Sequence, residues 1–159
     1  RKPKSTCTVV SIAEDSEHEH LAWDRTDELF SQGGINQASY EEPLFACVED
    51  LGGAEHVLGV AVGGLITTRG ILNDEMSEFR FSVAVDPKAR RRGVARALVR
   101  AIKDHWAAEQ AIWREAFGVE GVGLTAWVVN PHMVDLLESE GFSPDGSWSA
   151  DNPFMYFWG

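Results

Sequence analysis

The alternation of apolar and polar positions along the chain predicts a mixture of strands and helices. Apolar, β-branched runs predict strands at 6–12, 44–49, 56–68, 78–85 and 122–129, followed by closing strands from Phe142 onward and at 154–158. The turn Asp50-Leu51-Gly52-Gly53 predicts a hairpin between the second and third of these strands.

Helical spacing is clearest after Gly93, where apolar side chains recur at steps of three and four residues. This stripe consists of Val94, Ala97, Leu98, Ala101, Ile102, His105 and Trp106. An acidic surface helix is expected at 13–31, ended by Gly33-Gly34, with a short helix or turn at 36–41. A further helix begins at Asn130-Pro131 and ends at Gly141. The order of elements predicts a single α/β domain over 1–159, built around a mixed sheet.

The net charge of the chain limits the classes of molecule that it is expected to bind. The chain of 159 residues has 25 acidic against 14 basic residues, a formal net charge of −11. Such a surface repels phosphate backbones and anionic lipids, so we expect neither nucleic acid nor a membrane as a partner. A cationic ligand is favoured instead.

The cysteines and the N-terminal segment indicate the compartment. Cys7 and Cys47 lack the spacing of a metal site and are too few for a disulfide framework. No apolar signal core follows the basic start of the chain, and its apolar stretches are shorter than a membrane span. His18 and His20 are two residues apart and make a poor metal pair. The sequence therefore predicts a reduced, cytoplasmic protein without a metal.

The segment that carries chemistry is a strand, Val83-Ala84-Val85, that runs into a basic loop and then into the strongest helix. The loop holds Arg90-Arg91-Arg92 and Gly93. Backbone N–H groups at a helix start carry the positive end of the macrodipole, and a glycine lets a diphosphate come close to them. The pattern indicates an anionic ligand, although a solvated arginine loop ahead of an ordinary helix explains the same residues.

Two motifs together resemble the GNAT superfamily of N-acetyltransferases. Arg90-x-x-Gly93-x-Ala95 resembles that family's acetyl-CoA pyrophosphate loop, and the helix from Asn130 to Gly141-Phe142 resembles its second signature. The order of elements also matches, over nearly the whole chain. The resemblance implies a GNAT-like α/β fold with a mixed, mostly antiparallel central sheet flanked by helices. It implies that acetyl-CoA is bound by Val83, Ala84, Val85, Arg90, Arg91, Arg92, Gly93, Val94, Ala95, Arg96 and Asn130. For Asn130, a plain helix cap remains an equal interpretation.

The catalytic residues of the family carry over less well. The position where many members have a tyrosine acid holds Leu137, which cannot donate a proton, and a strand position sometimes occupied by a glutamate base is Thr125. Glu78 is one residue from the usual register of another base, where Phe79 stands. We take Glu78 as the candidate base and Tyr156 as the candidate acid. A surface carboxylate and a core aromatic are the respective alternatives, and catalysis by proximity alone is a further one.

The resemblance implies direct attack of a primary amine on the acetyl thioester in a ternary complex. The region expected to line the acceptor site is acidic, which favours a small cationic amine or a peptide or lysine amine. Its residues are Glu14, Asp15, Glu17, Glu19, Asp24, Asp27, Glu28, Glu41 and Glu42. A solvated acidic helix is the alternative for this region. The alternative for the whole protein is a non-catalytic, GNAT-like acyl-CoA-binding sensor or partner module, and a homodimer is compatible with the aromatic closing strand.

Overall fold

The fold is taken from a computed structural model, which describes residues 7–13, 17–32, 42–69, 75–128 and 130–157. The elements are β1 (Cys7–Ser11), α1 (Glu19–Gln32), β2 (Glu42–Leu51), β3 (Ala54–Arg69), β4 (Glu75–Val85), η1 (Pro87–Ala89), α2 (Val94–Phe117), β5 (Gly123–Trp127), α3 (His132–Ser139), β6 (Phe142–Pro144) and β7 (Phe154–Phe157). The glycine pair at 33–34 and the short element expected at 36–41 lie outside the described residues.

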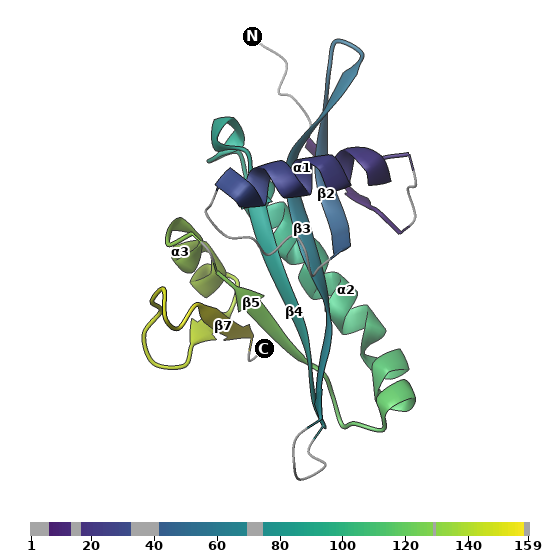
Figure 1. The fold of residues 1–159 in the computed structure, drawn as a ribbon, viewed down its shortest axis with the longest axis vertical. Coiled ribbons are helices and arrows are strands. Elements are labelled where there is room, and N and C mark those ends of the chain that lie inside the picture. The colour runs from purple at the N-terminus through teal and green to yellow at the C-terminus, as the bar shows by residue number, and fades with distance from the viewer. Residues whose placement is uncertain (1–6, 14–16, 33–41, 70–74, 129, 158–159) are drawn as a thin grey trace. The chain divides into compact units, whose positions relative to one another are not determined.

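The strands follow the hydrogen-bonding order β1-β2-β3-β4-β5-β7-β6. Figure 1 labels β2, β3 and β4, which are neighbours in this order. β4 and β5 are parallel, whereas β1–β2, β5–β7 and β6–β7 are antiparallel. This confirms the predicted α/β class with a mostly antiparallel sheet. The chain contacts itself in two compact units, residues 1–62 with 83–101 (unit 1) and residues 63–82 with 102–159 (unit 2). The single domain over 1–159 stays a prediction.

Unit 1 forms its core where α1 packs on β2 and β3. The buried side chains are Ile12, Ala22, Leu29, Phe30, Ala46, Val48, Val57, Val60 and Val62. At Gly59 of β3, an added Cβ would lie 2.9 Å from Val94 Cγ1 and 3.1 Å from Leu98 Cδ1. The first turns of α2 therefore approach β3 closely because this position has no side chain.

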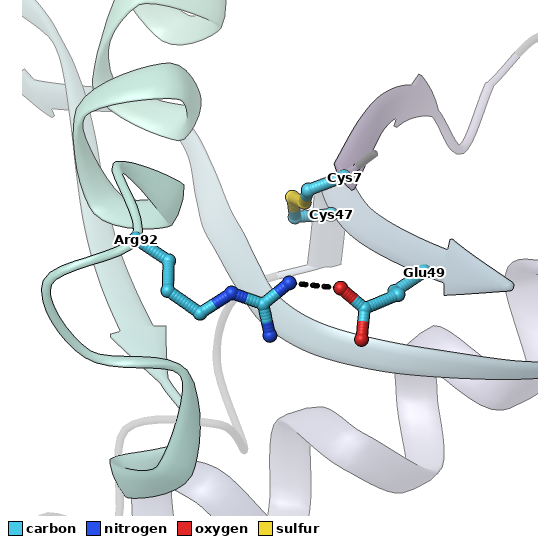
Figure 2. The surroundings of a disulfide bond; sticks show 4 residues. All are labelled: Cys7, Cys47, Glu49 and Arg92. Atoms are coloured by element: carbon cyan, nitrogen blue, oxygen red, sulfur yellow. Dashed lines mark hydrogen bonds and ion pairs between the residues drawn. A yellow bond between two sulfur atoms is a disulfide. The ribbon is translucent and has the colours of Figure 1, made fainter. Parts of the chain in front are cut away.

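The cysteines of unit 1 correct a prediction. Cys7 and Cys47 form a disulfide, with Cα atoms 5.9 Å apart, in place of the reduced thiols that we expected (Figure 2). Their sequence separation is 40 residues, so the pairing depends on the antiparallel register of β1 and β2 rather than on local spacing. That register places Cys7 opposite Glu49, two residues beyond Cys47 on the same face of β2.

Unit 2 has one apolar face, which packs against the second part of α2. The ring of Phe79 stacks on Trp113 and contacts His105, and Trp106 contacts Phe157 edge-on. Phe81, Leu124, Ala126, Phe142 and Met155 complete this face and are buried. Alternation along the strands leaves the other face to the polar residues described below.

The helix predicted to start at Asn130-Pro131 starts at His132 as α3, with Pro131 at the N-cap position. The Asn130 side chain accepts a hydrogen bond from the His132 N–H at 3.0 Å, so it still satisfies the first N–H of the helix. Gly141 has a φ of 94°, and its N–H donates to the Glu138 carbonyl at 3.1 Å. A left-handed glycine thus ends the helix.

Candidate functional site

The basic loop after β4 is anchored at its first residue. The Asp86 N–H donates to the Leu58 carbonyl at 2.7 Å, and the Asp86 carboxylate accepts from the Lys88 N–H at 2.9 Å and from Arg25 Nη2 at 2.6 Å. These donors, the Lys88 amide first, hold the pKa of Asp86 below its usual value. The backbone that leaves β4 is therefore held in place at the first residue of the loop.

The loop itself adopts a left-handed conformation at two residues. Arg91 has a φ of 67° and Gly93 a φ of 78°. Arg90, Arg91 and Gly93 are exposed, and an added Cβ at Gly93 would meet no atom within 4 Å. The space beside this backbone is open, as close approach of a ligand requires.

Helix α2 starts directly after this turn. Its hydrogen bonds begin with the Ala97 N–H, which donates to the Gly93 carbonyl at 3.0 Å. The N–H groups of Val94 and Ala95 precede that bond and have no acceptor within the helix. Together with exposed arginines, they fit an anionic diphosphate.

Arg92 has a partner that sequence reasoning missed. Its guanidinium forms an ion pair with Glu49 of β2, whose side chain is only 4% exposed, whereas that of Arg92 is 34% exposed (Figure 2). The signal in the sequence is weak: a glutamate that continues the apolar run 44–48. The two residues are 43 apart in the chain.

The other residues predicted to bind acetyl-CoA lie at the end of β4, in the first turn of α2 and just before α3. Val83 is buried and Ala84 and Val85 are half-buried at the end of β4. Arg96 is half-buried in the first turn of α2. Asn130 is half-buried and accepts from the N–H of His132 at the start of α3. Their contacts with acetyl-CoA stay predictions.

A second group of polar residues lies on unit 2, on the face opposite Phe79. The Glu78 carboxylate accepts from Thr125 Oγ1 at 2.8 Å through Oε2, and its Oε1 pairs with Arg80. Thr125 is 2% exposed and lies directly opposite Tyr156 in the β5–β7 register. The strands therefore bring both predicted catalytic residues onto the face that carries Thr125.

Arg80 is the member of this group that the sequence analysis did not identify. Its guanidinium carbon lies 4.6 Å from the Phe154 ring centroid and 6.0 Å from that of Trp127. Contacts of this kind are cation–π interactions, and they restrict where the guanidinium can move. The signal was the spacing of Glu78 and Arg80, because residues two apart in a strand share a face.

The structure places two of the residues that depart from the family pattern in the core. Phe79, at the usual position of the base, is 3% exposed and belongs to the apolar face, so no bulge carries Glu78 to that position. Leu137 is 2% exposed in α3. Tyr40, the other tyrosine, lies outside the described residues, as do Glu14, Asp15 and Glu41 of the acidic region.

Metal binding and membrane spanning can be judged only for the residues that the structure describes. Within the described ranges, no three His, Cys, Asp or Glu side chains are grouped so as to hold a metal ion. No helix among the described elements has the length and apolar character needed to span a membrane.

Solved structures of similar fold cover almost the whole chain. AtaTR bound with acetyl-CoA is 16% identical, with a TM-score of 0.55 over 95% of this chain and 92% of that one. AtaT complexed with acetyl-methionyl-tRNAfMet is 16% identical, with a TM-score of 0.53 over 96% and 94%. The KacTA–DNA complex is 17% identical, with a TM-score of 0.54 over 96% and 92%. At these identities the likeness establishes the fold.

These structures correct the expectation about nucleic acid. We excluded nucleic acid as a partner from the net charge, yet two proteins of this fold are in structures with tRNA or DNA. The exclusion is therefore wrong. Net charge averages over the whole surface, whereas a nucleic acid contacts one patch of it.

The family follows from the sequence as well as from the fold. No curated protein sequence matches the chain significantly. The family model described as "Acetyltransferase (GNAT) domain" matches residues 44–144, which is more than half of the chain. The protein therefore belongs to the GNAT acetyltransferase family, whose co-substrate is acetyl-CoA.

Proposed function

We propose that this protein is an N-acetyltransferase that moves the acetyl group of acetyl-CoA to a primary amine by direct attack in a ternary complex. The observation that carries the proposal is the hydrogen bond from Thr125 to Glu78, which fixes a carboxylate on the face shared with Tyr156. A carboxylate and a phenol on the same face of a sheet are groups that can remove one proton and supply another.

The loop of unit 1 supplies binding. The diphosphate of acetyl-CoA would be held by the N–H groups of Gly93, Val94 and Ala95, with Arg90 and Arg91 as exposed cations beside them. Arg92 and Arg96 would add charge, and the strand 83–85 would accompany the pantetheine arm. The open space at Gly93 and the helix start support this assignment.

Residues of unit 2 supply proton transfer. Acetyl-CoA provides the activated thioester when bound. Primary amines are protonated near neutral pH, with a pKa around 10, so the acceptor must lose a proton before it attacks. Glu78 accepts that proton, and the Tyr156 hydroxyl donates one to the departing sulfur. Arg80 and Thr125 each occupy one oxygen of Glu78, and a carboxylate has further lone pairs for the acceptor.

The acceptor is a primary amine on a small cationic molecule, a peptide or an aminoacyl-tRNA. Exposed carboxylates of α1, Asp24 and Asp27 among them, favour a cationic molecule. AtaT, which has a similar fold, forms a complex with acetyl-methionyl-tRNAfMet, so the amino group of a charged tRNA is a further candidate acceptor. Spermidine, a lysine peptide and methionyl-tRNA represent the three classes.

CoA release in the presence of these three amines tests the proposal. Wild-type protein is expected to release CoA with at least one of them, and Glu78→Gln to lower the turnover number at least ~100-fold, as loss of a general base does. Tyr156→Phe should lower it as well. Glu138→Gln, at an exposed position of α3, is the matched control and should retain wild-type turnover. Full activity of Glu78→Gln and Tyr156→Phe would contradict the assigned roles.

One observation favours a second function. Leu137, at the usual position of the acid, is buried and cannot donate a proton. This supports the alternative of a non-catalytic acyl-CoA-binding module. Two results together would favour that alternative. The protein would bind acetyl-CoA saturably, and it would release no CoA with any of the three amines.

A further inference from the structure

Glu49 is a buried carboxylate whose ion pair connects β2 to the basic loop at 86–93, the proposed diphosphate site. Glu49 is 3% exposed as a residue, and its carboxylate pairs with Arg92 in the middle of the loop (Figure 2). Breaking a buried ion pair by removing one partner is costly. The ion pair therefore ties Arg92 to β2.

In the chain, Arg92 lies between the two left-handed residues of the loop. Arg91 has a φ of 67° and Gly93 a φ of 78°, so the neighbours of Arg92 on both sides are left-handed. A left-handed conformation is unfavourable for a residue with a Cβ, and Arg91 keeps it only where other contacts enforce it. The residue between them, Arg92, forms the ion pair with Glu49.

Glu49 is itself fixed from the side of the sheet. The disulfide between Cys7 and Cys47 joins β1 to β2, and Cys7 is the register partner of Glu49. Cys7, Cys47 and Glu49 thus lie on the same face, at the point where the edge strand is cross-linked to its neighbour. The carboxylate sits on a rigid support, as a positioning residue requires.

We propose that Glu49 is a positioning residue for acetyl-CoA binding, which acts through Arg92 to hold the turn at 91–93 in its binding conformation. This rests on the proposed use of the loop for the diphosphate. Glu49 does not touch the ligand. It keeps the backbone N–H groups of the loop aligned, which lowers the cost of ordering them when the diphosphate binds.

A double-mutant cycle measured by calorimetric titration of acetyl-CoA tests this role. Glu49→Gln removes the charge with little change in volume and should weaken acetyl-CoA about tenfold, the effect of losing one charge-assisted hydrogen bond. In the Arg92→Gln background the same change should have no further effect, because Glu49 acts through Arg92. Glu55→Gln, which removes the carboxylate of the His18–Glu55 pair in the same unit, is the control and should leave the affinity unchanged.

Each outcome decides. Wild-type affinity of Glu49→Gln, or effects of Glu49→Gln and Arg92→Gln that multiply in the double variant, would overturn the role of Glu49 alone. Absence of acetyl-CoA binding by the wild-type protein would overturn the proposed function together with this role. If Arg92→Gln does not fold, Glu49→Asp takes its place: it keeps the charge and should bind within about threefold of the wild type, tighter than Glu49→Gln.

Discussion

The basic loop at 86–93 in unit 1 and the group around Glu78 in unit 2 are built in different ways. The loop is one contiguous segment, and its proposed binding groups are backbone N–H groups presented by a turn and a helix start. The Glu78 group is assembled from side chains of β4, β5 and β7, and its members are joined by strand register. A substitution in the loop acts through local backbone shape, whereas one in the group acts through a hydrogen bond.

The largest expected effect comes from blocking the loop. Gly93→Glu places a side chain and a negative charge where the diphosphate is proposed to bind, and should reduce acetyl-CoA affinity more than about 100-fold, since a close backbone approach is lost and like charges repel. Calorimetric titration measures this.

The matched control for that variant is Gly146→Glu. Gly146 also has a positive φ, 86°, and open space around its Cβ position, so the strain and the charge are the same. Equal loss of affinity in both variants would show that the effect is general destabilisation, and the loop would not be the diphosphate site.

A smaller effect is expected from the Glu78 group. Thr125→Val keeps the shape of a buried side chain but removes the hydroxyl that donates to Glu78. The turnover number should fall about tenfold with an unchanged KM for acetyl-CoA, because one hydrogen bond to a charged group is lost. Steady-state kinetics with the best of the three amines measures both values.

Thr125→Ser separates positioning from packing. It restores the hydroxyl, removes one methyl group, and should recover most of the turnover. If serine and valine at this position behave alike, the hydrogen bond to Glu78 has no part in the reaction.

The smallest expected effect is on the free energy of unfolding, and it comes from Asp86, the residue that anchors the start of the loop. The pKa of Asp86 is lowered by the Lys88 N–H and by Arg25, so the folded state favours the charged carboxylate. This stabilisation is present above the ordinary aspartate pKa of about 3.9 and is lost as the pH falls through the lowered value. Asp86→Asn should therefore cost about 1 kcal/mol or less at pH 7, and the cost should disappear in acid.

Urea denaturation at pH 7 and at pH 3 checks this sign, with Asp104→Asn at an exposed position of α2 as the control. An Asp86→Asn cost that grows toward low pH would contradict the assigned cause.

The sequence predicts the loop better than it predicts the group around Glu78. The strand, the arginines, Gly93 and the helix stripe are neighbours in the chain, so local rules suffice to place them. Arg80 and the hydrogen bond from Thr125 depend on how β4 is paired with β5, and a shift of one residue would turn each side chain to the other face. Glu49 and the cysteine pair were missed for the same reason, because both require the pairing of β1, β2 and the loop.

The backbone at Arg91 has a consequence for how this protein can vary. Glycine or asparagine would adopt a φ of 67° at lower cost, roughly 1 kcal/mol less than arginine in the case of glycine. Replacement at this position would therefore be favoured by any procedure that selects for thermal stability alone. Under the proposed function, the same replacement removes a cation beside the diphosphate. Stability and affinity are thus opposed at this one residue, and screens for either property should choose different side chains there.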